Sequence, residues 1–169
     1  MTDIQGLIDS ARALYALYGD SILGNEIIAD LLHTYKEDIG RTNRMMRHAD
    51  IVATCSDCAK QGHGSCCMKD VEGWYDPILL MINLLMGVKI SDSREIAGHC
   101  LFLGKSGCKL TARYFFCVNY LCPRLKSLLG QARAQEFISV AGRELFSGWT
   151  VEQSLRKWLD LHAYCTTGY

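Results

Sequence analysis

The distribution of cysteine constrains this chain more than any other feature of its sequence. Nine cysteines are present, and eight of them fall in one stretch: Cys55, Cys58, Cys66, Cys67, Cys100, Cys108, Cys117 and Cys122. The ninth, Cys165, stands apart near the C-terminus. Cysteine thiolates are ligands of zinc and of iron–sulfur clusters, and clustering of this density is typical of metal-binding proteins. We therefore interpret all eight clustered cysteines as metal ligands.

The sequence predicts a cytoplasmic protein that does not contact the membrane. Its first residues lack the basic segment followed by an apolar run that a secretory signal contains. The longest apolar run, 78–86, is interrupted by Asn83 and is far shorter than the ~20 residues that span a bilayer. In a reducing cytosol, clustered cysteines serve as metal ligands or redox groups more often than as structural disulfides. A disulfide-stabilised secreted protein is therefore disfavoured.

The length of 169 residues predicts a single domain. Folding at this size buries roughly 68–70% of the surface of the unfolded chain, so a hydrophobic core suffices without crosslinks. We expect N-terminal helices over 1–53, a cysteine-cluster metal-binding core over 54–122 and C-terminal helices over 123–169. The predicted fold class is mainly α, with an irregular cysteine-rich centre and at most one short β-hairpin.

Apolar spacing predicts the helices before the cluster. Residues 3–18 and 22–39 have apolar side chains at helical intervals, and Gly19-Asp20 is expected to separate the two helices. The second helix is expected to run on to about residue 53. Residues 54–76 read as a loop, which would place Cys55 and Cys58 on one tight turn.

The remaining elements are predicted from capping and turn residues. Asp76-Pro77 is expected to begin a buried helix that Gly87 ends. Segments 100–103 and 108–110 read as two short strands around a glycine-bounded turn. Further helices are expected over 123–129 and 131–146, and Thr150 with Gln153 resembles a capping box that starts a last helix.

The spacing of the cysteines leaves the number of metal sites open. Cys55-x-x-Cys58 is the usual spacing for two ligands of one metal. Adjacent residues such as Cys66 and Cys67 rarely bind one tetrahedral ion without strain. They more naturally supply two different metals, or one ligand and one free thiol. Eight thiols satisfy two four-cysteine sites. They equally satisfy one four-cysteine cluster with a redox-active or zinc-bound remainder.

Charge is balanced over the chain but uneven along it. The formal net charge is zero, yet residues 96–135 contain no Asp or Glu. The same stretch has six basic residues: Lys105, Lys109, Arg113, Arg124, Lys126 and Arg133. This stretch overlaps the last four clustered cysteines. The cations could form a solvated face for an acidic partner or nucleic acid, or could compensate the charge of metal-bound thiolates. Both interpretations stay open.

Three further residues, His63, His99 and Cys165, are considered as members of the metal site. His63 and His99 lie close in sequence to cluster cysteines, and each is either a metal ligand or proton donor or an ordinary loop histidine. Cys165 reads as a packed or unligated thiol.

The cysteine pattern resembles the YkgJ-type cysteine-cluster family, a zinc- or iron-chelating domain family that includes flagellin lysine N-methylases. The resemblance rests on Cys55-x-x-Cys58, Cys66-Cys67, Cys100-Leu-Phe-Leu103, Gly107-Cys108-Lys-Leu110, Arg113, Cys117, Tyr120 and Cys122. Seven residues separate Cys58 from Cys66, where the family has two or three. Arg113-Tyr114 stands in place of Arg-Pro, and Cys100-Leu101 in place of Cys-Pro.

The resemblance implies a bound metal, with an iron–sulfur cluster favoured and zinc as the alternative. Two functions therefore compete. The first is a metalloprotein with a redox or enzymatic role on an unidentified small-molecule substrate. The second is a structural-zinc module that contacts a protein partner or, less favoured, nucleic acid. The chain contains no recognisable nucleotide-binding or S-adenosylmethionine-binding motif, so enzymatic activity and its substrate are left open.

Overall fold

The computed structural model describes residues 3–60 and 66–166 of the chain, and side chains over 3–59 and 66–162. This part of the chain is mainly α-helical, as the sequence predicts, and contains one short hairpin. The elements in chain order are α1 (Ile4–Leu23), α2 (Glu26–His48), α3 (Ile51–Lys60), the 3₁₀ helix η1 (Val71–Trp74), α4 (Pro77–Leu85), β1 (Leu103–Gly104), β2 (Gly107–Cys108), α5 (Phe115–Asn119) and α6 (Pro123–Thr166).

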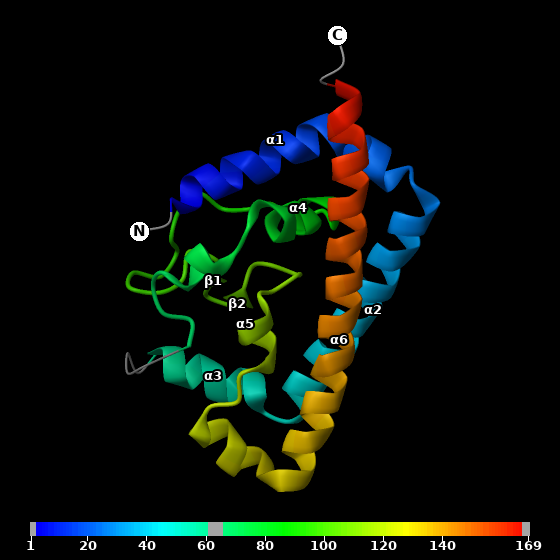
Figure 1. Ribbon diagram of the computed structural model, residues 1–169. Coiled ribbons are helices and arrows are strands. Elements are labelled where there is room, and N and C mark those ends of the chain that lie inside the picture. The colour runs from blue at the N-terminus through cyan, green and yellow to red at the C-terminus, as the bar shows by residue number, and fades with distance from the viewer. Residues whose placement is uncertain (1–2, 61–65, 167–169) are drawn as a thin grey trace.

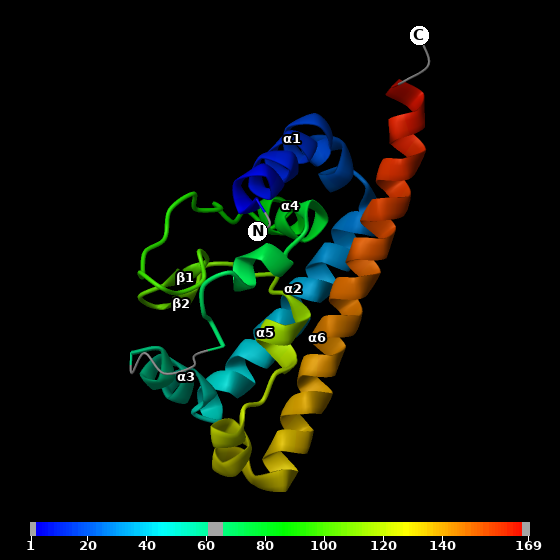
Figure 2. The ribbon, with the colours of Figure 1, turned by 60° about the vertical axis from the view of Figure 1, so that its left-hand side comes forward.

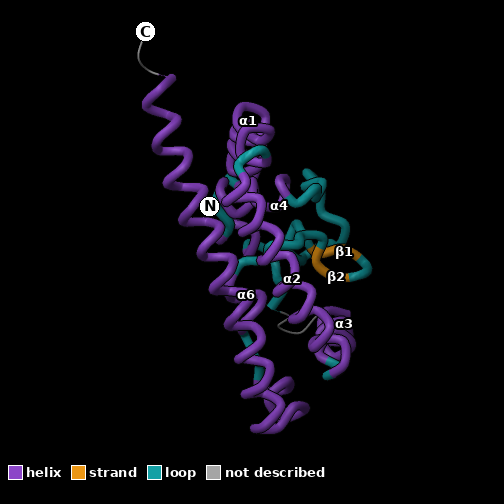
Figure 3. The backbone as a smooth tube through the Cα atoms, turned by 90° about the vertical axis from the view of Figure 1, so that its right-hand side faces the viewer, coloured by secondary structure: helices purple, strands orange, loops and turns teal. Residues whose placement is uncertain are grey.

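Two long antiparallel helices form the spine of the fold. α6 runs alongside α2 in the opposite direction, and its C-terminal end projects past the rest of the molecule (Figures 1 and 2). α1 packs on α4 near that end. The hairpin, α3 and α5 lie to one side of the α2–α6 pair in Figure 1, and Figure 3 shows the hairpin and α3 on that side from another direction. All eight clustered cysteines belong to segments on this side.

The buried side chains form two cores. The larger one joins α1, the first part of α2, α4, the hairpin and the last part of α6, with Ile8, Leu80 and Phe102 at its centre. The smaller one joins the start of α3 to α5 and the first part of α6, through Ile51, Val118 and Phe137 among others. Cys100 belongs to the larger core and Cys67 packs against it, whereas Cys55 and Cys122 pack against the smaller one.

The boundary between the first two helices differs from the prediction. α1 continues through Gly19 and ends at Leu23, because Gly19 is buried under the ring of Tyr15 and does not face water as a helix-ending glycine would. The break falls instead at Gly24-Asn25. The side chain of Asn25 accepts a hydrogen bond from the amide of Ile28 and so starts α2.

The prediction that residues 54–76 form a loop from their start is wrong, as is the prediction that α2 runs on to residue 53. α2 ends at His48, and Asp50 turns the chain with a φ of 56°. α3 then begins at Ile51, whose burial in the smaller core fixes it there. Cys55 and Cys58 therefore lie one helical turn apart on α3, and not on a tight turn.

The later elements confirm the predicted buried helix and hairpin. The side chain of Asp76 caps α4 by accepting from the amide of Leu79 at 2.8 Å, and Leu103 pairs with Cys108 in the hairpin. The predicted helix start at Thr150 is wrong. Gly130, with a φ of 65°, marks the kink inside α6, whereas the hydroxyl of Thr150 donates to the carbonyl of Phe146 within the helix.

Of the helices in the described residues, none is both long enough and apolar enough to cross a membrane.

Candidate metal centre

The eight clustered cysteines come from six short segments of the fold. Cys55 and Cys58 lie on α3, the Cys66-Cys67 pair precedes η1, and Cys100 leads into the hairpin. The remaining three are Cys108 on β2, Cys117 on α5 and Cys122 immediately before α6. None of the eight, all of which lie within the described residues, forms a disulfide.

Four of the cysteines form a first thiol group: Cys67, Cys100, Cys108 and Cys117. Burial raises the pKa of Cys100 to about 12 and that of Cys117 to about 11, and the charge of Cys108 raises both further. Burial also raises the pKa of Cys108, although the residue as a whole is exposed. The charges of Cys108 and Cys117 also raise the pKa of Cys67. These four thiols are thus close enough to repel one another when ionised.

The other four cysteines form a second thiol group: Cys55, Cys58, Cys66 and Cys122. Burial raises the pKa of Cys55 to about 11, and the charges of the other three members raise it too. Cys55 and Cys122 pack against the smaller core. In the first group, by contrast, Cys100 belongs to the larger core and Cys67 packs against it. The two thiol groups therefore lie on different cores.

The two groups meet at Cys66 and Cys67. The thiol of Cys67 donates a hydrogen bond to the sulfur of Cys66, which lowers the pKa of Cys66 to about 6 and raises that of Cys67. Cys66 interacts electrostatically with Cys55 of the second group and also with Cys117 of the first, whereas Cys67 interacts with Cys108 and Cys117. The Cys66–Cys67 pair therefore links the two groups.

The side chains do not form a closed coordination sphere. Over residues 3–60 and 66–166, no three side chains of His, Cys, Asp or Glu stand close enough together to hold a metal ion. The structure thus gathers the predicted ligands into two groups without converging them on one point. Their chemistry still fits a soft metal, because each group offers four thiols whose mutual repulsion a cation would relieve.

Buried polar groups fix the cysteine-bearing segments in place. Asn83 of α4 is fully buried; its side chain accepts from the amides of Thr111 and Ala112 at 2.9 Å each and donates to the carbonyl of Ala112. This anchors the chain between Cys108 and Cys117. The amide of Cys100 also donates to the carbonyl of Cys67 at 2.9 Å, which joins two members of the first group through their backbones.

Tyr75 connects the first thiol group to the larger core. Its hydroxyl accepts from the amide of Tyr114 at 3.0 Å and donates to the sulfur of Cys117. Nearby, the carboxylate of Glu72 pairs with Arg94, whose guanidinium also donates to the carbonyl of His99, the residue before Cys100. Sequence analysis did not single out Tyr75, Asn83 or Glu72. The one signal available was a polar residue inside an apolar run, at Asn83.

Three of the six predicted cations act on the thiols. Arg113 lowers the pKa of Cys108 and Cys117 against the larger effect of burial, and Lys109 acts similarly on Cys108. Arg124 does the same for Cys55. Positive charge from the acid-free stretch therefore lies near both groups, as the charge-compensation interpretation requires.

Several aromatic residues beside the first group are exposed, whereas Tyr114 and Phe116 are half-buried. Phe115 is 57% exposed, and Trp74 and Tyr120 are also exposed. Their rings form a continuous surface: Trp74 meets Phe116 edge-on at 5.1 Å, and Phe116 stacks on Tyr120 at 4.5 Å.

Of the two candidate histidines and Cys165, the structure describes the side chain of His99 only. Nδ1 of His99 lies 3.1 Å from the carbonyl oxygen of Ala97, so a local backbone contact accounts for one of its ring nitrogens. His63 lies outside the described residues, and so does the side chain of Cys165.

Comparison of the chain with models of protein families, with curated proteins and with solved structures found no match.

Proposed function

We propose that this chain is a metal-binding protein whose eight clustered cysteines supply two four-thiolate sites. The observation that supports the proposal is the gathering of thiols from six segments into two groups of four. The groups separate at Cys66 and Cys67, the one pair whose members cannot easily share an ion. Four thiolates are the ligand set of structural zinc and of the common iron–sulfur clusters.

We further propose that at least one site holds an iron–sulfur cluster with a redox or enzymatic role in the cytoplasm. The resemblance to the YkgJ-type family favours iron, and nearby cations suit a cluster that carries net negative charge with its thiolates. Arg113 and Lys109 at the first group and Arg124 at the second provide this charge. Bound there, such a cluster would supply electron transfer or a Lewis-acidic iron.

An alternative function has its own supporting observation. The exposed aromatic surface formed by Trp74, Phe115, Phe116 and Tyr120 adjoins the first thiol group. Exposed aromatic clusters of this kind mark interaction sites. With zinc in both groups, the centre would be structural and this surface would contact a protein partner or, less favoured, nucleic acid.

Metal analysis of anaerobically purified protein tests the proposal. Iron, zinc and acid-labile sulfide are measured per chain, together with the visible spectrum. Two paired variants divide the groups: Cys100→Ser with Cys117→Ser in the first, and Cys55→Ser with Cys58→Ser in the second. Cys165→Ser is the matched control. We expect each paired variant to lose the metal of one site only, and the control to lose none.

The outcomes separate the two metals. A brown protein with sulfide supports the iron–sulfur cluster, whereas colourless protein with two zinc ions per chain rejects the cluster and supports the structural-zinc alternative. Protein that holds no metal under anaerobic conditions and takes up neither iron with sulfide nor zinc would contradict both. Loss of all metal in either paired variant would contradict a division into two sites.

A further inference from the structure

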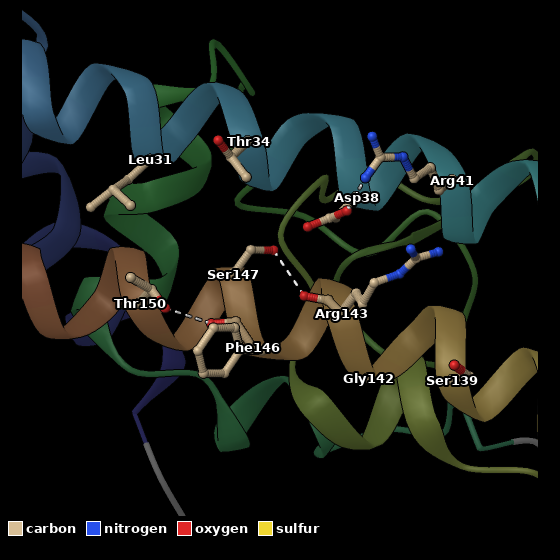
Figure 4. A pocket seen from close by; sticks show the side chains of 10 residues that line it. All are labelled: Leu31, Thr34, Asp38, Arg41, Ser139, Gly142, Arg143, Phe146, Ser147 and Thr150. Atoms are coloured by element: carbon tan, nitrogen blue, oxygen red, sulfur yellow. Dashed lines mark hydrogen bonds and ion pairs between the residues drawn. The ribbon is translucent and has the colours of Figure 1, made fainter.

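A groove runs along the outer side of the α2–α6 pair, on helix faces that take no part in the metal centre. Its volume is about 520 Å³, within the ~300–1,000 Å³ typical of small-molecule sites. Figure 4 shows Leu31 and Phe146 towards one end and Asp38, Arg41 and Arg143 towards the other. The groove is therefore amphipathic along its length.

The apolar end exposes an aromatic surface. Phe146 is 68% exposed and stacks on Trp149, which is also exposed, with ring centroids 6.1 Å apart. Leu31 lines the same end of the groove from α2. Large apolar side chains gathered beside a cavity mark a binding surface more often than isolated exposed ones do.

The polar end has a surplus cation. Asp38, whose side chain is nearly buried, is neutralised by Arg41 at 2.7 Å, and Arg41 also lies 3.7 Å from Glu37. Arg143 forms no ion pair with any residue in the described part of the chain. Its guanidinium extends towards α2, to the same end of the groove as Arg41 (Figure 4). One anionic group would complete the charge balance there.

We propose that this groove binds a small amphipathic carboxylate. Arg143, with Arg41 beside it, holds the carboxylate, and the hydrocarbon part lies along Leu31 and Phe146. An arginine suits this role because its guanidinium forms two parallel hydrogen bonds with a carboxylate. The site is separate from the cysteine groups, so the proposal stands whether or not the chain binds metal.

Calorimetric titration of the full-length chain with fatty carboxylates tests the proposal. Butanoate, hexanoate and octanoate are compared below their micellar concentrations, with octan-1-ol as the uncharged match for octanoate. We expect affinity to rise about fourfold for each added CH₂ until the groove is filled. Octan-1-ol should bind at least about tenfold more weakly than octanoate, because it cannot form the charged pair.

Gly142 offers a variant that fills the groove without disturbing the core. A Cβ built on this residue would meet no atom within 4 Å, and Gly142 lines the groove. Gly142→Leu should therefore lower octanoate affinity more than about tenfold, whereas Gly142→Ala, which adds one methyl group to the same position, should change it little. Arg143→Gln should remove the preference for octanoate over octan-1-ol, while Arg133→Gln, on the same helix outside the groove, should keep it.

Three results would overturn the proposal. They are no octanoate binding at millimolar concentration, equal affinity for octanoate and octan-1-ol in the unaltered chain, and undiminished octanoate binding by Gly142→Leu. Helical content and thermal unfolding of each variant are checked first. If Gly142→Leu does not fold, the Arg143→Gln comparison alone decides.

Discussion

The guanidinium of Arg113 lies 3.9 Å from Oε1 of Glu144, a carboxylate that is 0% exposed inside the α2–α6 pair. Among the described residues, neither oxygen of Glu144 has a hydrogen-bond partner. Arg113 donates instead to Oδ1 of Asn43 at 2.9 Å and acts electrostatically on Cys108 and Cys117. One buried cation is thus shared between an under-solvated carboxylate and the first thiol group.

Replacing Arg113 should destabilise the fold strongly. Arg113→Met leaves Glu144 buried without its cation, which costs about 3–5 kcal/mol of unfolding free energy. Adding Glu144→Leu to that variant removes the stranded charge and should restore most of the loss. Urea unfolding of the metal-free proteins at pH 7 measures both. A double variant no more stable than Arg113→Met would show that Arg113 acts through other contacts.

The stability of the metal-free chain should depend on pH through Glu144. Burial raises the pKa of Glu144 above its usual 4.5, against the smaller opposing effects of the Thr42 hydroxyl and of Arg113. The folded state therefore keeps this proton to higher pH than the unfolded state does, and Glu144 favours folding below pH 4.5 and loses that contribution as pH rises through its folded pKa. Glu144→Gln should be increasingly stabilising relative to the unaltered chain as pH rises above 4.5. A stability difference that does not change with pH would contradict the raised pKa.

Cys66 should be the most reactive thiol of the metal-free chain. Its pKa of about 6 depends on the hydrogen bond from Cys67, so at pH 7 it is largely a thiolate while Cys55, Cys100 and Cys117 stay protonated. Iodoacetamide labelling followed by peptide mass spectrometry from pH 5 to 9 should show Cys66 modified first, with a midpoint near pH 6. Cys67→Ala should move that midpoint towards 9, whereas Cys67→Ser, which keeps a donor, should move it less.

Sequence patterns predicted the elements whose signals are local. The cap at Asp76, the glycines around the hairpin and the kink glycine Gly130 each act within a few residues, and all three predictions are confirmed. The errors came where tertiary burial overrides local signals. Gly19 ends no helix because Tyr15 covers it, and α3 forms because Ile51 reaches the smaller core.

The thiols that make up the candidate site were predictable from the sequence, but their division into two groups was not. Cysteine density identified all eight thiols, and the adjacency of Cys66 and Cys67 suggested two sites. Which cysteines join which group depends on the two cores, since Cys100 belongs to one and Cys122 packs on the other. The sequence did not indicate the contacts between the charged residues that support the site either, because these contacts depend on tertiary packing. Arg113 and Glu144 are 31 positions apart and meet only through the packing of α6 on α2.

Asn83→Leu should damage the first thiol group more than the second. The buried amide of Asn83 makes four hydrogen bonds, three of them to residues 111–112, and its replacement leaves two amides and one carbonyl of that segment unpaired. Each net bond contributes about 0.5–1.5 kcal/mol, so a loss of about 2–4 kcal/mol is expected. Urea unfolding measures it. Zinc titration of the same variant should show weakened binding at one site only; equal weakening at both would argue against a local anchor.

Zinc binding should release more protons from the first group than from the second. Cys100 and Cys117 have pKa values of about 12 and 11, and those of Cys67 and Cys108 are also raised, so all four thiols are protonated at pH 7. Because zinc binds thiolates, filling the first group should displace about four protons. In the second group Cys66 is already largely ionised, so fewer protons should appear.

The paired serine variants of the metal test keep two thiols in the altered group, which can still bind zinc. This measurement therefore uses two triple variants that both keep Cys66 and Cys67: Cys55, Cys58 and Cys122 are serine in one, and Cys100, Cys108 and Cys117 are serine in the other. Calorimetry at pH 7 in buffers of different ionisation enthalpy gives the proton count for the intact group. For the first group, the logarithm of zinc affinity should rise with a slope of about four per pH unit near neutrality. A count of two or fewer there would mean that fewer than four thiols bind the ion, and equal counts for the two groups would contradict the ionised state of Cys66.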